Sequence, residues 1–179
     1  MRGIGVDRGD NLGDAKGQFL VFDIGSRDNT SNNHVERAKM IMNTVFTCDG
    51  KYPPVKGHYE DAGVDLRAQE EYIIRAGGSI TIDTMTMADI PLGYWGKLES
   101  KSGLNVNNSV VSLGGTIDSN YSGHIRAKLY NFSDDDYHIH AGDKIVQMVI
   151  MPCVVDGIEG VEIQTDEDRG TGGFGSTGR

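Results

Sequence analysis

Two short polar segments contain the residue types that could carry chemistry. The segment GTIDSNYSG, residues 115–123, places a carboxylate, Asp118, three residues before an aromatic ring, Tyr121. The segment SKSGL, residues 100–104, places the cation of Lys101 and two hydroxyl groups beside a glycine. A carboxylate can accept a proton from water, and backbone N–H groups near a glycine can receive an anion. Each segment also has an ordinary interpretation, a β-hairpin for the first and a polar loop that opens a short helix for the second.

Glycine dominates the end of the chain. The segment RGTGGFGSTGR, residues 169–179, has one aromatic side chain, Phe174, among its glycines. It resembles a phosphate-binding glycine loop, yet it lacks the Gly-Lys-Ser/Thr ending of a P-loop. Taken alone, this composition predicts a flexible tail.

Short strands are the elements expected to position these segments. From residue 44 to about residue 163, apolar residues come in short runs separated by turn residues, which is typical of an all-β domain. So many short strands in a small chain favour a jelly roll or a related β-sandwich. The strands are expected at residues 44–48, 64–68, 72–75, 78–83, 94–99, 109–113, 124–130, 144–151 and 158–163.

Two of these strands have clear patterns. In residues 124–130, Ile125, Ala127 and Leu129 alternate with polar residues, which predicts one buried and one exposed face. Residues 144–151, KIVQMVIM, form a nearly continuous apolar run and are expected to be buried on both faces.

The composition excludes several classes of protein. Among 179 residues, 26 are acidic and 17 are basic, a formal net charge of −9, with no cluster of lysine or arginine. A protein that binds duplex nucleic acid needs the opposite charge, so no nucleic-acid partner is expected. No segment approaches the roughly 20 apolar residues of a membrane span, and the start of the chain has no apolar signal region. We therefore expect a cytoplasmic protein without a membrane partner, with Cys48 and Cys153 reduced.

Taken in order, the polar segments form a recognisable set. Five short motifs occur in sequence: AGVDLRA at 62–68, SKSGL at 100–104, GGTIDSNYSG at 114–123, GDKIVQMVI at 142–150 and RGTGGFGSTG at 169–178. With these five motifs the chain closely resembles the trimeric dUTP pyrophosphatase (dUTPase) family, from about residue 44 to its end. The resemblance implies an all-β, distorted jelly-roll β-sandwich or barrel that assembles as a homotrimer.

The resemblance also divides the chain into three regions. Residues 1–43 are an N-terminal extension, for which a short helix over 33–43 and a disordered leader are both open. Residues 44–164 are the dUTPase-like β domain, and residues 165–179 are a glycine-rich lid that completes a neighbouring active site. In the family, the third motif comes from one subunit, the first, second and fourth from another, and the fifth from the last. A monomer is therefore expected to be inactive.

The family hydrolyses dUTP to dUMP and diphosphate by attack of water on the α-phosphorus. The resemblance implies that Asp118 orients and deprotonates that water, because a carboxylate is ionised at neutral pH. Tyr121 would pack beneath the deoxyribose and leave no space for a 2′-hydroxyl group. The backbone of residues 114–123, including Gly115 and Ile117, would form hydrogen bonds with the edge of uracil.

Expectations for the metal and the phosphates follow from the same resemblance. The family uses Mg²⁺ held by phosphate oxygens and water, and Asp65 would act on it indirectly, through that water. Such an arrangement suits an ion that gives up its hydration shell reluctantly. Phe174 would stack on the uracil. The residues expected to line the phosphates or to close over the nucleotide are Lys101, Ser102, Gly103, Gln147, Arg169, Gly175, Ser176 and Thr177.

Departures from the family pattern keep two alternatives open. Lys101 stands where the family usually has arginine, which keeps the charge but loses the bidentate geometry. A dCTP deaminase shares the fold, but it has an essential glutamate where this chain has Lys128. The second alternative is a non-catalytic nucleotide-binding or regulatory protein on the same scaffold.

Overall fold

Antiparallel β-strands make up almost all the regular structure. The computed structural model describes residues 44–161 and the backbone of Leu20–Val21, and within them one short helix interrupts the strands. In chain order the elements are β1 (Leu20–Val21), β2 (Val45–Cys48), β3 (Gly63–Arg67), β4 (Tyr72–Ile74), β5 (Ser79–Asp83), β6 (Thr86–Asp89), β7 (Tyr94–Ser100), α1 (Ser102–Asn108), β8 (Val110–Ser112), β9 (Thr116–Asp118), β10 (Arg126–Asn131), β11 (Tyr137–Ile139) and β12 (Lys144–Pro152). The predicted all-β class is confirmed.

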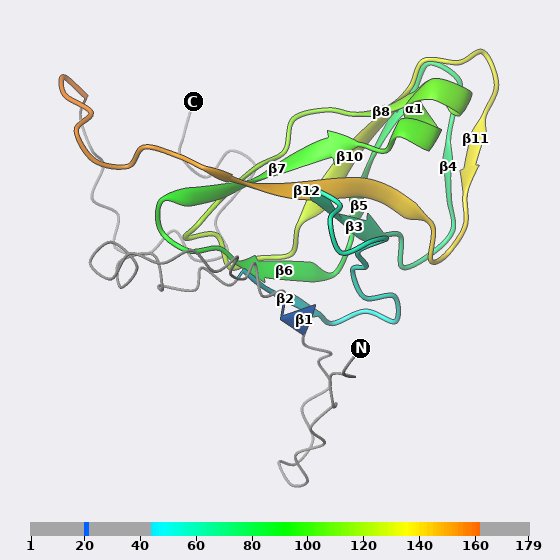
Figure 1. The fold of residues 1–179 in the computed structure, drawn as a ribbon. Helices are drawn as coiled ribbons and strands as arrows, with labels where there is room; N and C mark the ends of the chain where they lie inside the picture. Colours follow the sequence, from blue (N-terminus) through cyan, green and yellow to red (C-terminus); the bar gives the residue numbers. More distant parts are fainter. Residues whose placement is uncertain (1–19, 22–43, 162–179) are drawn as a thin grey trace, which may run out of the picture.

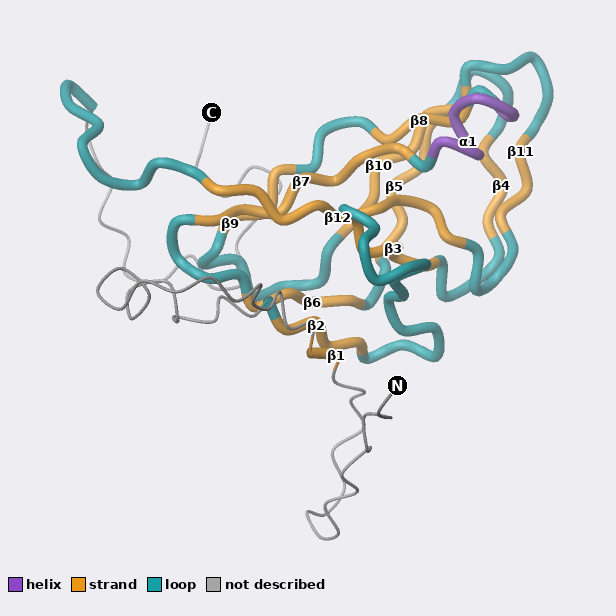
Figure 2. The backbone as a smooth tube through the Cα atoms, in the orientation of Figure 1, coloured by secondary structure: helices purple, strands orange, loops and turns teal. Residues whose placement is uncertain are grey.

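The strands form four small sheets. Their orders are β1–β2–β6, β5–β10–β8, β11–β4 and β3–β12–β7–β9. The long strand β12 lies at the centre of the last sheet, because it pairs with β3 on one side and with the whole of β7 on the other. Figure 1 shows β12 and β7 crossing the molecule side by side, and Figure 2 shows that loops connect most of the strands. These two strands position the polar segments, because SKSGL begins at the last residue of β7, β9 pairs with β7 and most of the fourth motif lies in β12.

Apolar side chains from all four sheets meet in one core. Ile82, Ile125 and Ala127 have no exposed surface, and each buried side chain of the size of isoleucine stabilises the fold by about 1.5–3 kcal/mol. The other members of the core are Phe46, Val64, Leu66, Ala68, Ile74, Ala88, Ile90, Leu98, Val110, Ile117, Tyr121, Leu129, Ile139, Ile145, Val146 and Met148.

The alternating pattern predicted for residues 124–130 is confirmed. In β10, Ala127 and Leu129 are buried, whereas the side chain of Arg126 is exposed and that of Lys128 is half-buried. Ile125 is buried too, but it lies just before the strand begins. The strand therefore presents one face to the core and one to solvent.

Burial of β12 on both faces is correct only for its first part. Ile145 and Val146 are consecutive and both buried, but Val149 is half-buried and Met151 is 37% exposed. The pairing with β3 shifts register between Lys144 and Val146. Such a bulge adds one residue to the strand, so two neighbouring side chains can turn towards the core.

The predicted hairpin over residues 115–123 is wrong. Its first flank, β9, pairs with β7, and the strand that follows, β10, pairs with β5 and β8. Turn residues alone do not make a hairpin, because each flank pairs with a strand of a different sheet. The connecting segment therefore bridges two sheets, and we refer to residues 119–124 as the Tyr121 loop.

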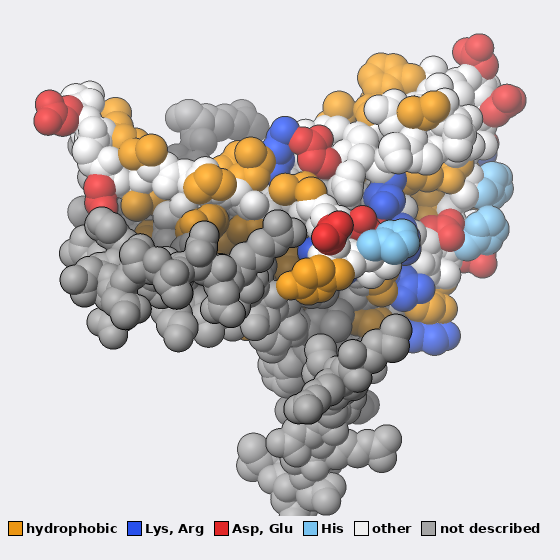
Figure 3. Space-filling view, viewed as in Figure 1, with side chains coloured by type: hydrophobic (Ala, Val, Ile, Leu, Met, Phe, Trp, Pro, Cys, Tyr) orange, Lys and Arg blue, Asp and Glu red, His pale blue; other side chains and the backbone are white. Residues whose placement is uncertain are grey.

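An extended arm follows β12. Residues 153–161 contain no strand, so the strand expected at 158–163 is wrong over its described part. Figure 1 shows this arm leading away from the sheets, and Figure 3 shows hydrophobic side chains along it. The proposed lid, and the extension apart from the pairing of Leu20–Val21 with β2, lie outside the described residues.

Candidate active site

The residues singled out from the sequence gather at two ends of β7. Lys101 directly follows the end of this strand, whereas Asp118 pairs with Trp95 near its start. Lys101 is six residue steps after Trp95 along an extended chain, and a strand rises about 3.3 Å per residue. The two groups are therefore on the order of 20 Å apart within one chain, and Figure 2 shows β9 and α1 well separated.

One end holds a cluster of charged groups. Asp65 in β3 has a side chain only 8% exposed, yet both of its oxygens form ion pairs. The Lys101 ammonium pairs with Oδ1, and Nζ of Lys144 lies 3.0 Å from Oδ2. A buried carboxylate is stable only when it is paired. Because two cations share one carboxylate, this lysine–aspartate cluster carries a net positive charge that can attract an anion.

The bulge in β12 explains how Lys144 reaches this cluster. In a regular strand, residues three apart point to opposite faces, so Lys144 and Gln147 would diverge. The extra residue of the bulge brings Lys144 opposite Arg67, while Gln147 lies opposite Asp65. Both side chains then face the same side of the sheet.

Gln147 lies against the cluster in a confined place. Its Nε2 atom is 3.4 Å from the main-chain oxygen of Ser100. A Cβ atom added at Gly63 would come within 2.7 Å of the Gln147 side-chain oxygen, so a larger residue at this position would displace the amide. The first, second and fourth motifs thus come together within one chain.

Ser102 and Gly103 begin α1 beside the cluster. Both are exposed, and the first hydrogen bond of this turn runs from the N–H of Asn105 to the oxygen of Lys101 at 2.9 Å. The earlier N–H groups of the helix therefore precede its internal hydrogen bonds and are available to another acceptor. The alternative interpretation of SKSGL, a polar segment that opens a short helix, is confirmed and is compatible with anion binding.

The other end of β7 holds the third motif. Asp118 is half-buried at the end of β9, while Ile117 is 5% exposed and points into the core. Gly115 has a φ of +111° and its oxygen accepts a 2.8 Å hydrogen bond from the N–H of Leu98. A Cβ atom at Gly115 would lie 2.4 Å from Cβ of Leu98. The position therefore requires glycine for both its backbone angle and its close approach to β7.

Tyr121 is fixed at both its backbone and its hydroxyl group. Its N–H donates a 3.1 Å hydrogen bond to the oxygen of Asp118, and its hydroxyl group donates one of 2.8 Å to the oxygen of His124. The side chain is 9% exposed. It borders an open cavity of about 460 Å³, which is lined by Val45, Thr47, Met87, Ala88, Asp89, Ser119, Asn120, Tyr121 and Ser122.

Several expected site residues are not tested by the structure. Arg169, Phe174, Gly175, Ser176 and Thr177 lie outside the described residues. The sequence analysis gave no role to Lys144, which lies within the fourth motif, or to His124, which directly follows the third motif.

Neither a metal cluster nor a membrane span is formed by the part of the chain that the structure describes. Within residues 44–161, no three side chains of His, Cys, Asp or Glu are grouped to hold a metal ion. No helix in the described residues is long and apolar enough to cross a membrane.

Comparison with known proteins decides the family. The family model described as dUTPase matches residues 52–178. The chain belongs to the dUTPase family. Because the matched range starts after β2 and runs through all five motifs, the dUTPase part includes both ends of β7.

Curated relatives agree in their names. The deoxyuridine 5′-triphosphate nucleotidohydrolase of Picosynechococcus sp. is 42% identical over 147 residues, which cover 81% of this dUTPase and 99% of that protein. The probable deoxyuridine 5′-triphosphate nucleotidohydrolase of Schizosaccharomyces pombe is 38% identical over 125 residues, which cover 70% and 89%. The chain is therefore a dUTP nucleotidohydrolase, a hydrolase of nucleotide metabolism.

Solved structures share the fold. The dUTPase of Staphylococcus bacteriophage 80alpha with dUpNHpp superposes with a TM-score of 0.61 at 26% identity, covering 76% of this chain and 98% of that one. A mutant dUTPase from phage phi11 of S. aureus, described as revealing the coordination of a structural Mg(II) ion, has a TM-score of 0.56 at 26% identity, covering 63% and 90%. The expected dUTPase-type β fold is confirmed.

Proposed function

We propose that this dUTPase converts dUTP to dUMP and diphosphate by Mg²⁺-assisted attack of a water molecule that Asp118 activates. The observation that supports this proposal is the separation of the site into two chemically distinct halves. One half has a carboxylate beside the buried ring of Tyr121, and the other has the lysine–aspartate cluster with Gln147. Hydrolysis of a nucleoside triphosphate needs both a proton acceptor and an anion-binding site.

The reaction follows from these groups. Asp118 accepts a proton from water, the water oxygen forms a bond to the α-phosphorus, and the bond from that phosphorus to the bridging oxygen of diphosphate breaks. Lys101, Ser102, Gly103 and Gln147 bind the phosphate oxygens. Gly115, Ile117 and their neighbours present backbone groups to the uracil, and Tyr121 packs beneath the deoxyribose, where its ring excludes a 2′-hydroxyl group.

Magnesium fits this site when the substrate and water supply most of its ligands. Asp65 is the carboxylate of the cluster, and each of its two oxygens already forms an ion pair with a lysine. Mg²⁺ usually keeps several waters and binds through one or two carboxylates together with substrate phosphates, so Asp65 is suited to contact Mg²⁺-bound water. The ion, when bound with the nucleotide, supplies positive charge that lowers the charge repulsion at the phosphates.

The distance between the halves supports active sites shared in a homotrimer. Asp118 and Lys101 of one chain lie on the order of 20 Å apart along β7. A triphosphate is much shorter than this separation, so one nucleotide cannot contact both groups of the same chain. We propose that Asp118 of one subunit acts on a nucleotide held by the cluster of another subunit. Arg169, Phe174, Gly175, Ser176 and Thr177 of a third close over it and exclude water.

In the cell this activity would limit the incorporation of uracil into DNA and supply dUMP for the synthesis of dTMP. We propose a cytoplasmic location for it, with dUTP as the substrate and no nucleic-acid or membrane partner. We also propose that residues 1–43 are an N-terminal extension and that residues 165–179 are a lid that completes a neighbouring active site.

Diphosphate release from the purified protein with Mg²⁺ tests the function. Release from dUTP is expected to be much faster than release from dCTP, dTTP or UTP. The Asp118→Asn variant is expected to lose at least about a hundredfold in kcat, because an amide cannot accept the proton. Asp134→Asn, an exposed carboxylate away from the motifs, serves as the matched control. Ammonia released from dCTP, or an Asp118→Asn variant with normal turnover, would contradict the proposal.

A further inference from the structure

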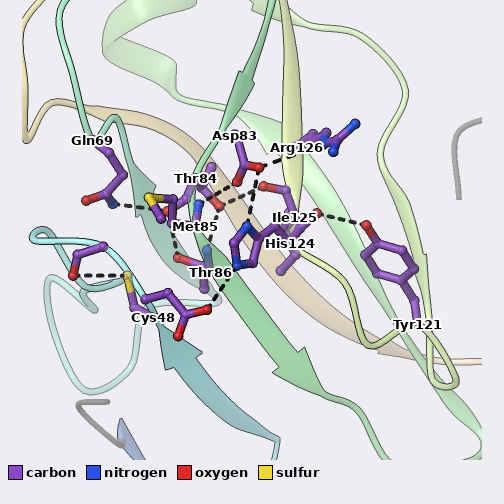
Figure 4. Close-up of polar contacts among 12 residues, drawn as sticks. Cys48, Gln69, Asp83, Thr84, Met85, Thr86, Tyr121, His124, Ile125 and Arg126 are labelled. Carbon is purple, nitrogen blue, oxygen red and sulfur yellow. Dashed lines mark hydrogen bonds and ion pairs between the residues drawn. The ribbon is translucent and has the colours of Figure 1, made fainter. Parts of the chain in front are cut away.

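His124 ends the Tyr121 loop and lies between two carboxylates. Its Nε2 atom is 3.1 Å from Oδ2 of Asp49, and its Nδ1 atom is 3.3 Å from Oδ2 of Asp83. A neutral imidazole has one N–H donor, so only the imidazolium can donate to both carboxylates at once. Figure 4 shows the His124 ring directed towards Asp83, with the Tyr121 hydroxyl group directed towards the main chain at His124.

The two carboxylates belong to a corner that is itself fixed. The N–H of Asp49 donates a 2.9 Å hydrogen bond to the oxygen of Met85, and Oδ1 of Asp83 accepts one of 2.7 Å from the N–H of Met85. Met85 has a φ of 52°, a left-handed conformation that marks a tight corner. His124 therefore connects the Tyr121 loop to a rigid junction of β2, β5 and β6.

The main chain of His124 is the point to which Tyr121 is bound. The tyrosine hydroxyl group donates its 2.8 Å hydrogen bond to the carbonyl oxygen of His124. Gly123 lies between them, and a Cβ atom there would come within 2.6 Å of that hydroxyl oxygen. The orientation of the ring therefore depends on where the His124 carbonyl group lies.

We propose that His124 is a positioning residue: clamped between Asp49 and Asp83, it fixes the carbonyl group that binds Tyr121 and so sets how strictly the enzyme rejects ribonucleotides. This inference rests on the proposed place of Tyr121 beneath the deoxyribose. A ring held in one place excludes a 2′-hydroxyl group by steric overlap, whereas a ring that can shift admits it. Rejection of the wrong substrate by overlap needs a rigid wall.

The charges around His124 give the clamp a pH dependence. Asp49 and Asp83 face the ring, and Nε of Arg126 lies 3.9 Å from Oδ2 of Asp83 and shares that carboxylate. The pKa of His124 is raised above the ordinary value of 6.5, first by the hydrogen bond to Asp49 and then by Asp83, against the opposing effect of burial. A raised pKa means that the clamp is complete below about pH 6.5 and weakens as the pH rises through the folded-state pKa.

Kinetics with dUTP and UTP test the inference. In His124→Gln, the ratio of kcat/KM for dUTP to that for UTP is expected to fall about tenfold, the size expected for loss of a charge-assisted hydrogen bond. A merely structural role would lower both values alike. In the wild type the ratio is expected to fall as the pH rises through the raised pKa of His124, while in His124→Gln it stays constant. Ionisations that affect the hydrolysis of both substrates equally cancel in this ratio. The pH profile of the wild type also tests the inference without any mutation, so it does not depend on whether His124→Gln folds.

A double-mutant cycle with Tyr121→Phe shows whether the effect passes through the hydroxyl group. In the Tyr121→Phe background, His124→Gln is expected to change the ratio no further. The matched control His58→Gln removes an exposed His58–Asp61 pair of 3.6 Å and should leave the ratio unchanged. An unchanged ratio in His124→Gln, or a fully additive loss in the double variant, would overturn the inference. Absence of dUTP hydrolysis by the wild type would instead overturn the proposed function.

Discussion

Asp65 carries one negative charge but contacts two lysines, so it can neutralise only one of them. The positions of the two lysines decide what each one contributes. The carboxylate is buried, so it needs at least one cation at all times. Lys144 is anchored on the bulge of β12, whereas Lys101 lies at the start of α1 next to exposed Ser102 and Gly103. Lys101 can therefore turn to a phosphate group while Lys144 continues to pair with Asp65.

Replacement of Lys101 tests this division of roles. Lys101→Met is expected to lower kcat/KM for dUTP about a hundredfold, as when a group that stabilises transition-state charge is removed. The thermal unfolding midpoint should change little, because Lys144 still pairs with Asp65. Lys101→Arg is expected to keep most of the activity, and Lys51→Met, an exposed lysine elsewhere, is the control. Near-normal kcat/KM in Lys101→Met would remove this lysine from phosphate binding.

Motifs in the sequence single out candidate site residues, but they do not single out the residues that support them. Asp65, Lys101 and Gln147 come from motif positions, and the structure brings all three together. Lys144 was missed because strand periodicity places it on the opposite face, and only the bulge reverses that. His124 was missed because its carboxylate partners come from distant segments that no local pattern connects.

At the scale of the elements, β7 and the Gly114–Gly115 turn fix where β9 begins. Gly115→Ala places a methyl group 2.4 Å from Cβ of Leu98 at a φ of +111°. It is expected to lower the free energy of unfolding by about 3 kcal/mol, through steric overlap and backbone strain together. Gly114→Ala has a φ of +72° but open space, so about 1 kcal/mol is expected.

Urea unfolding of both variants separates these two causes. Because Gly114→Ala carries only the backbone strain, the difference between the variants measures the contact with Leu98. If the backbone of Gly115 also binds uracil, the same substitutions are expected to lower kcat. Equal losses of stability in the two variants would show that the close approach to Leu98 does not matter.

The alternation of apolar and polar residues predicted a strand correctly where one face of that strand packs on the core. The alternation in residues 124–130 became β10 because one face of that strand meets the core. The hairpin over 115–123 failed because its flanks pair with β7 and with β5 and β8, contacts between residues far apart in the sequence. Turn residues show that a chain bends, but the pairing partner depends on the whole sheet.

At the scale of the whole molecule, the exposed arm after β12 supports a subunit contact. Val154 is 76% exposed, Val155 46%, Ile158 57% and Val161 58%. Several large apolar side chains exposed on one segment typically mark a surface that another protein covers. Together with the separation of the two halves of the site along β7, this surface favours assembly of several copies of the chain.

Mixing two inactive variants tests whether subunits share their sites. Asp118→Asn lacks the proposed base and Lys101→Met lacks the proposed phosphate contact, so each homotrimer is expected to be nearly inactive. When the two chains are unfolded and refolded together in equal amounts, some sites combine an intact Asp118 from one subunit with an intact Lys101 from another. Random assembly gives both intact groups in about a quarter of the sites, so about a quarter of the wild-type activity should return.

The distribution of activity separates a shared site from a site within one chain. If each chain carried its own complete site, no chain of the mixture would hold both intact groups, and refolding together would restore nothing. Simple mixing of the folded variants without subunit exchange is the control and should stay inactive. Because about 20 Å of β7 separates the two groups within one chain, recovery requires that they meet across a subunit interface.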